Sequence, residues 1–276
     1  MRLRVTRTTV LRRAIALVTL IAALRAPVAA DELAERPDER LAWLPGFSTA
    51  LGYHYSVGDY GLSRDTEVMY VPLLLRAEIE RWSLQLTLPY LHIRGPAGIF
   101  GIVAAENADT VHSSDGFGDI LLDSRYTFDP WLAWLPYVGL TGQVKFPTAS
   151  ESQGLGTGSF DYGLGVDLSW SVGRTSFVIS GGRRFLGNAD DYALNDVFTG
   201  SGALIRSFAD WLDIGVMLDY QQPSSDSSGN VFDVFPYVSW RISPRWALDT
   251  YASFGLASGS PTYGSGLQLT LHVWQP

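Results

Sequence analysis

Large apolar residues alternate with small or polar residues along most of this chain. Between Trp82 and Tyr90 every even position is Trp, Leu or Tyr, whereas every odd position is Ser, Gln, Thr or Pro. Between Phe160 and Trp170 the even positions are again large and apolar, and the odd positions are Asp, Gly or Ser. A β-strand sends successive side chains to opposite faces, whereas an α-helix repeats every 3.6 residues. The period of two therefore predicts two-sided β-strands.

The alternation recurs in twelve segments, and it is weakest in segments 67–78 and 196–208. Most segments hold 11–13 residues, whereas strands of soluble proteins average about 5–6 residues. A strand of this length, rising about 3.3 Å per residue and tilted by about 45°, gains about 28 Å of height, which matches the hydrocarbon thickness of a membrane. We predict strands at 46–57, 67–78, 82–93, 116–128, 136–147, 158–172, 174–186, 196–208, 211–221, 231–242, 246–256 and 263–274.

One face of these predicted strands carries full charges, which a packed protein core could not hold unpaired. Both faces are explained if the apolar face meets lipid and the charged face lines a water-filled lumen. The sequence therefore predicts an all-β fold, a twelve-stranded antiparallel transmembrane β-barrel of the outer membrane over residues 46–276. The predicted lumen-lining residues are Asp119, Asp123, Arg125, Lys145, Asp161, Asp167, Arg184, Asp219, Arg241 and Asp249.

The connections between the predicted strands alternate between long and short. Outer-membrane barrels have long external loops and short periplasmic turns. All nine tryptophans lie beside the short connections or near the ends of the predicted barrel, and an indole ring favours the membrane interface, where its body is buried and its N–H stays wet. We predict a periplasmic girdle that includes Trp82, Trp134, Trp170, Trp211, Trp240, Trp246 and Trp274.

Residues 1–30 have the pattern of a secretory signal peptide, with an arginine-rich start, an apolar stretch from Ala14 to Leu24 and small residues before Asp31. They hold six of the 20 basic residues and none of the 28 acidic residues, so the rest of the chain has a net charge of −14. Such a chain is a poor match for nucleic acid, which favours basic surfaces. We expect export, a periplasmic segment at residues 31–45, and no nucleic-acid partner.

The glycine run from Gly154 to Gly158 invites comparison with a phosphate-binding loop. However, Ser159 stands where a dinucleotide fingerprint has its third glycine, and a predicted strand rather than a helix follows. We interpret the run as a flexible external turn. His54 and His272 are expected in the lumen about 20 Å apart, and no nucleophile–base constellation is found. The sequence therefore predicts no enzyme, no cofactor and no metal site.

Two interpretations are open for the charges at the predicted external mouth. Lys145 ends one predicted strand and Asp161 begins the next, so we expect them to be near partners across the connection 148–157. The pair either forms a constriction that selects solutes by charge or simply cross-links and hydrates the wall. The acidic external loops likewise either bridge divalent cations to lipopolysaccharide or only favour solubility.

Three short motifs resemble the phenol meta-degradation pathway family of outer-membrane transporters. Gly116-Phe-Gly118-Asp119 is similar to the family's Gly-x-Gly-Asp strand entry, and Lys145-Phe-Pro147-Thr148 is similar to its Lys-x-Pro-Thr strand end. The segment from Gly154 to Tyr162 resembles its Gly-Thr-Gly strand entry. The residues that match are Gly116, Gly118, Asp119, Pro147, Thr148, Gly156 and Gly158.

This resemblance implies a barrel that passes small solutes, among them aromatic or hydrophobic ones. Barrels of this type end on an aromatic residue that the assembly machinery reads, whereas this chain ends Val273-Trp274-Gln275-Pro276. We expect a monomeric channel for passive uptake with a narrow polar lumen, and with membrane lipid, lipopolysaccharide and the barrel assembly machinery as partners. The alternative is a closed structural or surface-binding barrel that acts through its external loops.

Overall fold

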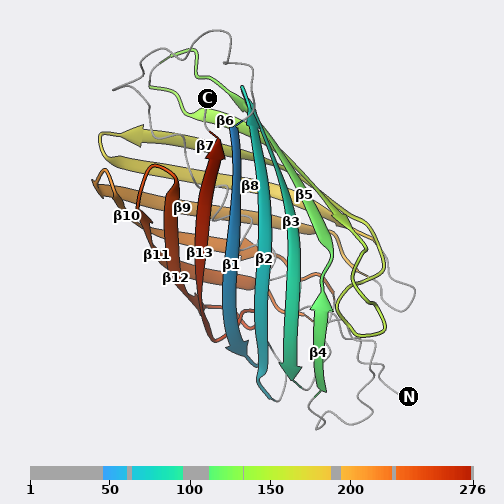
Figure 1. Cartoon of the computed structure of the whole chain (residues 1–276). Coiled ribbons are helices and arrows are strands. Elements are labelled where there is room, and N and C mark those ends of the chain that lie inside the picture. Colours follow the sequence, from blue (N-terminus) through green and yellow to red (C-terminus); the bar gives the residue numbers. More distant parts are fainter. Residues whose placement is uncertain are drawn as a thin grey trace.

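The computed structural model describes residues 46–60, 64–95, 112–132, 134–187, 194–225 and 228–274, which form thirteen β-strands (Figure 1). Every pair of neighbouring strands is antiparallel. No helix within these ranges is long and apolar enough to cross a membrane. The strands are β1 (Gly46–Gly58), β2 (Thr66–Ile79), β3 (Trp82–Gly95), β4 (His112–Phe117), β5 (Ile120–Phe128), β6 (Tyr137–Phe146), β7 (Asp161–Val172), β8 (Thr175–Leu186), β9 (Val197–Ala209), β10 (Leu212–Gln221), β11 (Val231–Arg241), β12 (Trp246–Gly255) and β13 (Tyr263–Trp274).

The sheet closes on itself as a twelve-stranded antiparallel β-barrel. Each strand from β5 to β13 pairs with the next, β13 pairs with β1, β1 with β2, and β2 with β3. Strand β5 pairs with the first half of β3, and β4 pairs with its second half. The two short strands therefore together occupy one of the twelve strand positions of the barrel. The fold class and the strand number predicted from the alternation are confirmed.

The fourth predicted strand, 116–128, differs from the structure in two respects. Its pairing begins earlier, at His112, and it is interrupted at residues 118–119 between β4 and β5. The interruption lies opposite Pro89, which has no N–H to give to the ladder, although the Pro89 carbonyl still accepts a hydrogen bond of 2.9 Å from the Gly118 N–H. Figure 1 shows β4 as a short arrow that leads into β5.

The two segments with weak alternation, 67–78 and 196–208, are nevertheless regular strands. On β2 the inward face is apolar as well as the outward face, since Tyr70 and Leu74 are buried while Leu73 and Leu75 are exposed. On β9 the outward face is interrupted by two glycines, between the exposed side chains of Phe198 and Leu204. In both strands the composition of one face hides the alternation.

The outside of the barrel is an apolar surface with an aromatic rim at the end of the short turns. Leu164, Val166 and many other large apolar side chains are exposed there, as expected of a wall that faces lipid. The seven predicted girdle tryptophans all lie at the short-turn end; Trp82 and Trp246 begin strands, and Trp274 ends β13. Trp43, the predicted signal peptide 1–30 and the predicted segment 31–45 lie outside the described residues.

On the inside, two tyrosine rings lie against glycines of the neighbouring strand. Tyr251 on β12 is paired with Gly266 on β13, and Tyr237 on β11 is paired with Gly215 on β10. A Cβ atom added at Gly266 would lie 2.3 Å from the Tyr251 ring, and one at Gly215 would lie 2.5 Å from the Tyr237 ring. The glycines therefore allow both rings to pack flat against the wall.

Replacing Gly266 by alanine is expected to displace the Tyr251 ring and to destabilise the barrel. Tyr251 is buried and is wedged between Phe235 and His54, so the ring cannot move without loss of contacts. Overpacking of this kind costs about 1–3 kcal/mol, which urea unfolding in detergent micelles measures. The matched control is Gly181→Ala on the outward face of β8, where the nearest atom would be 3.9 Å away. Equal stability of the two variants would contradict the packing argument.

Candidate functional site

The interior of the barrel has two chemically different walls. The inward side chains of β5 to β8, together with Arg76 of β2 and Ser83 and Gln85 of β3, line a polar cavity. Buried apolar side chains gather in two clusters, one mainly on β1 to β3 and one mainly on β9 to β12. We refer to this side as the apolar wall, although it also holds buried polar residues such as His54, Asp233 and Asp249. Around the closed sheet, β1 and β2 are about six strand positions from β8 and β9, so the apolar wall faces the polar one. Beside the polar side chains that the sequence predicts for the lumen, the interior therefore also holds buried apolar clusters.

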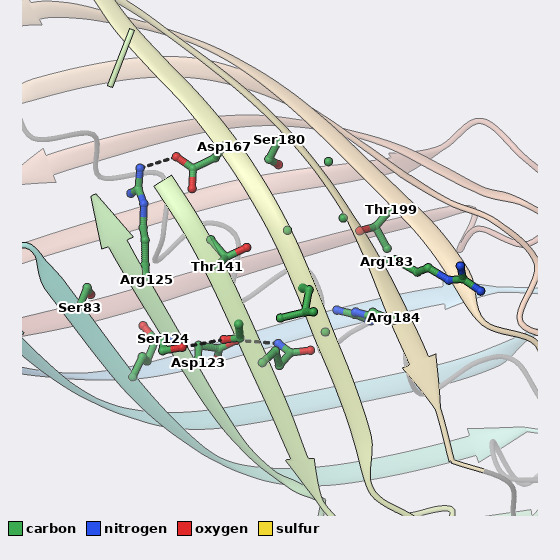
Figure 2. A pocket seen from close by; sticks show the side chains of 18 of the residues that line it. Ser83, Asp123, Ser124, Arg125, Thr141, Asp167, Ser180, Arg183, Arg184 and Thr199 are labelled. Atoms are coloured by element: carbon green, nitrogen blue, oxygen red, sulfur yellow. Dashed lines mark hydrogen bonds and ion pairs between the residues drawn. The ribbon is translucent and has the colours of Figure 1, made fainter. Parts of the chain in front are cut away.

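The cavity on the polar wall has a volume of about 210 Å³ (Figure 2). Arg125 on β5 donates to Asp167 on β7 at 2.5 Å, and the amide of Gln143 on β6 donates to Asp123 on β5 at 2.6 Å. Hydroxyl groups from Thr141, Ser180 and Thr199 also line it. Gly163, Gly165 and Gly182 bring no side chains to this wall. The absence of side chains at these glycines leaves the space that the cavity occupies.

The apolar wall contains a row of aromatic side chains at one level of the strand register. Tyr70 on β2 is paired with His54 on β1, which is paired with Gly266, and Gly266 is paired with Tyr251, which is paired with Tyr237. The Tyr251 hydroxyl lies 3.0 Å from His54 Nδ1, and the two rings stack with centroids 5.7 Å apart. All four side chains are buried, and none of them lines the cavity.

A buried ion cluster stands where β6 ends and β7 begins. Lys145 Nζ lies 3.1 Å from Asp161 Oδ2, 3.2 Å from Asp119 Oδ2 and 2.6 Å from Thr157 Oγ1. Lys145 is 5% exposed, and Asp119 is 2% exposed. Buried charges are tolerated when they are paired and hydrogen-bonded. We refer to Lys145, Asp119, Asp161 and Thr157 as the Lys145 cluster.

The Lys145 cluster fastens the loop 147–160 to the barrel. The backbone N–H of Ala149 donates to Asp119 Oδ1 at 3.0 Å, and the Thr148 hydroxyl accepts from the Ile120 N–H and donates to the Gly118 carbonyl. Gly156 packs so closely that an added Cβ would lie 2.9 Å from Asp119. The three motifs that resemble the transporter family thus meet at one place.

The tip of this loop packs inside the barrel at the long-loop end. Leu155 is 1% exposed and packs among inward side chains of β1, β2, β3 and β5, including Tyr70, Leu91 and Leu121. An added Cβ at Gly116 would touch Leu155 at 2.8 Å. The expectation of a flexible external turn is therefore wrong, because the glycines permit a close-packed plug instead.

The ten predicted lumen-lining residues all lie on the inward face of their strands or strand ends, but in separate groups. Asp123, Arg125, Asp167 and Arg184 line the cavity. Asp219 faces Asp233 across β10 and β11, and Asp249 is buried on β12. Arg241 forms an ion pair of 3.5 Å with Asp213 at the short-turn end. Lys145, Asp119 and Asp161 belong to the Lys145 cluster and are not among the residues that line the cavity.

Sequence reasoning missed the residues that close the interior. Thr157 and Leu155 lie in a loop, where the period of two carries no information about burial. The aromatic row was also missed, although it could have been found from the even spacing of Val68, Tyr70, Pro72 and Leu74 on the face of β2 opposite to its lipid side. Two apolar faces on one strand are a signal that the lumen beside it is not water-filled.

Comparison with known proteins adds to this description. The sequence profile of a family described as "Putative MetA-pathway of phenol degradation" matches residues 54–273. No curated protein sequence matches the chain. An outer membrane channel from Pseudomonas putida F1 is similar over 82% of this chain and 94% of its own, with 14% identity and a TM-score of 0.66.

Two further solved structures are similar at lower scores. The KdgM porin covers 80% of this chain and 98% of its own, with 10% identity and a TM-score of 0.50. The CymD monoaromatic hydrocarbon channel covers 83% and 89%, with 10% identity and a TM-score of 0.46. At 14% and 10% identity, the similarity to the Pseudomonas putida channel and to the KdgM porin concerns the barrel fold.

Proposed function

This chain belongs to the MetA-pathway phenol-degradation family, and we propose from this premise that it is an outer-membrane channel for the passive uptake of small solutes, among them aromatic or hydrophobic ones. In this proposal it is exported to the outer membrane of a bacterium and stands there as a monomer. Its long loops face outward, where lipopolysaccharide surrounds the barrel, and its tryptophan girdle marks the periplasmic interface.

The observation that carries the proposal is the cavity inside a closed wall whose outside is apolar. A barrel that served only as an anchor would gain nothing from keeping arginines, aspartates and glycines around an empty space of about 210 Å³. Ligand sites for drug-sized molecules measure about 300–1,000 Å³, so the space suits a smaller solute. The polar wall supports passage of a solute with hydrogen-bonding groups.

The aromatic row supports the inclusion of aromatic or hydrophobic solutes. Aromatic rings pair in offset or edge-to-face geometry with a gain of about 0.5–1.5 kcal/mol beyond burial. Tyr70, His54, Tyr251 and Tyr237 lie buried on the apolar wall, so in this proposal the ring of a solute reaches them when the loop 147–160 moves aside. The loop 147–160 narrows the external mouth and limits the size of what enters.

Liposome swelling tests the proposal. Vesicles that contain the folded mature protein should swell when diluted into small solutes such as glycerol, benzyl alcohol or benzoate, and the rate should fall as the solute grows. Vesicles with heat-denatured protein are the control. A barrel that admits none of the solutes in a broad panel would reject the proposal.

The same experiment addresses a second candidate function, a closed barrel that acts through its external surface. The observation that favours it is the burial of Leu155 among the inward side chains of β1 to β3, inside the barrel at the long-loop end. Absence of swelling for every solute, combined with normal folding, is the result that this second function predicts.

A further inference from the structure

The charges around the cavity differ from those of the rest of the chain. The whole sequence has a formal net charge of −8. Among the residues that line the cavity, in contrast, four are arginines and two are aspartates, while Glu78 and Asp219 act on two of these arginines from beside it. One of these arginines, Arg183, has its guanidinium over the exposed rings of Phe185 and Phe198 on the outside of the barrel. Three arginines therefore remain for the interior.

Two of the three interior arginines are engaged by carboxylates. Arg125 forms its short ion pair with Asp167. Arg76 lies 2.9 Å from Glu78 and donates to the Ser83 hydroxyl at 3.0 Å. A solute that sought these guanidinium groups would have to displace a neighbouring carboxylate or hydroxyl. Neither group is a free anchor for an anion.

Arg184 is placed differently. Its hydrogen bond, within the described part of the chain, goes to Gln221 Oε1 at 3.5 Å, which is longer than the usual 2.7–3.2 Å of such a bond. It interacts electrostatically with Asp123 and Asp219, but no carboxylate of the described residues lies within ion-pair distance of it. Figure 2 shows Arg184 extending toward Asp123 across the cavity wall.

The strand register places a glycine, two glutamines and Asp123 in the row that begins at Arg184. Arg184 is paired with Gly163, Gly163 with Gln143, Gln143 with Asp123, and Asp123 with Gln85. Gly163 packs against both neighbours, since an added Cβ would lie 3.3 Å from Gln143 Cβ and 3.7 Å from Arg184 Cγ. The amides of Gln143 and Gln85 line the same cavity as Arg184. A guanidinium presents donors in a planar fork that matches a carboxylate, and such bonds are about twice as strong as neutral ones.

We propose that Arg184 is the docking residue for the carboxylate of a small organic acid, and that this cavity gives the barrel a preference for such anions over neutral solutes of equal size. This proposal rests on the channel function proposed above and specifies its solute class.

The test compares benzoate with benzyl alcohol, which have similar size and differ in charge. In liposomes that contain the full mature protein, Arg184→Gln should lower the benzoate flux at subsaturating concentration by about tenfold, because a charge-assisted hydrogen bond is lost. The flux of benzyl alcohol should stay unchanged. Arg184→Lys should restore part of the benzoate flux, since it keeps the charge but loses the fork.

The matched control is Arg174→Gln, which removes the same charge from the exposed turn between β7 and β8, where Arg174 pairs with Asp210. It should leave both fluxes unchanged. A barrel that passes both probes but whose benzoate flux does not respond to Arg184→Gln would overturn the docking role and leave the channel function standing. A wild-type barrel that passes neither probe would overturn both. Heat-modifiable migration on gels verifies that each variant is folded.

Discussion

Replacing Lys145 by alanine is expected to free the loop 147–160 from the external mouth and to raise the single-channel conductance in planar bilayers. The substitution leaves Asp119 and Asp161 buried beside each other without their shared cation, and it removes the donor to Thr157. Loss of one partner from a buried ion pair costs about 3–5 kcal/mol. Water must enter to solvate the two carboxylates, and the loop is the part that can give way.

The effect of Lys145→Ala is measurable as a loss of stability and as a change in conductance. Urea unfolding of the barrel in micelles should show a stability loss of that order, or a separate early transition of the loop. The control is Arg81→Ala, which breaks an ion pair with Asp129 that is half exposed at a short turn and should change neither stability nor conductance. If Lys145→Ala keeps the conductance of the wild type, then the cluster only cross-links the wall and does not control the mouth.

The strands could be predicted from the sequence because the barrel wall separates two solvents. Lipid on one side imposes an apolar residue at every second position, and this holds for β7 over its whole length and for β3 from Trp82 to Tyr90. The position of the tryptophans at the short-turn end could be predicted for the same reason, and the interfacial girdle that they would form is a prediction. Strand β2 is an exception, because its lumen side is also apolar and the period of two is therefore weak in its sequence.

The geometry of the Lys145 cluster could be predicted only in part. The pairing of Lys145 with Asp161 follows from two consecutive strands and is found in the register. The third member, Asp119, belongs to a strand that is interrupted opposite Pro89, and its approach to Lys145 depends on where that interruption falls. The family motifs contain Lys145, Asp119 and Asp161, but the order of the motifs along the chain does not indicate that these residues form one cluster.

The burial of Leu155 could not be predicted because it depends on a fit between distant elements. The loop 147–160 reaches the inward face of β1 to β3, residues that lie up to about a hundred positions earlier in the chain. Gly156 and Gly158 allow this path, one by its close contact with Asp119 and the other by a φ of 67°. A glycine-rich loop on the printed sequence looks flexible, whereas the same glycines here permit a fixed conformation.

A second substitution separates the effect of the buried Leu155 side chain from that of the ion pairs in the Lys145 cluster. Replacing Leu155 by alanine is expected to lower the stability of the closed mouth by about 2–5 kcal/mol, the usual cost of removing a large buried aliphatic side chain, while the Lys145 cluster keeps its contacts. The loop should then open transiently, so that a cysteine placed at Ser152, an exposed position of the loop, becomes a readout of its motion through its spin-label spectrum.

Leu256→Ala is the matched control, since Leu256 is 60% exposed in the connection after β12 and should have no effect on that spectrum. If Leu155→Ala raises the swelling rate for larger solutes while Lys145→Ala does not, the apolar plug alone sets the size limit. If both variants raise the swelling rate by similar factors, and the double variant raises it no further, then the packing of Leu155 and the ion pairs of the Lys145 cluster act as one unit. Non-additivity of this kind is expected of neighbouring groups that close the same loop, and unchanged swelling in all three variants would show that the loop does not limit entry.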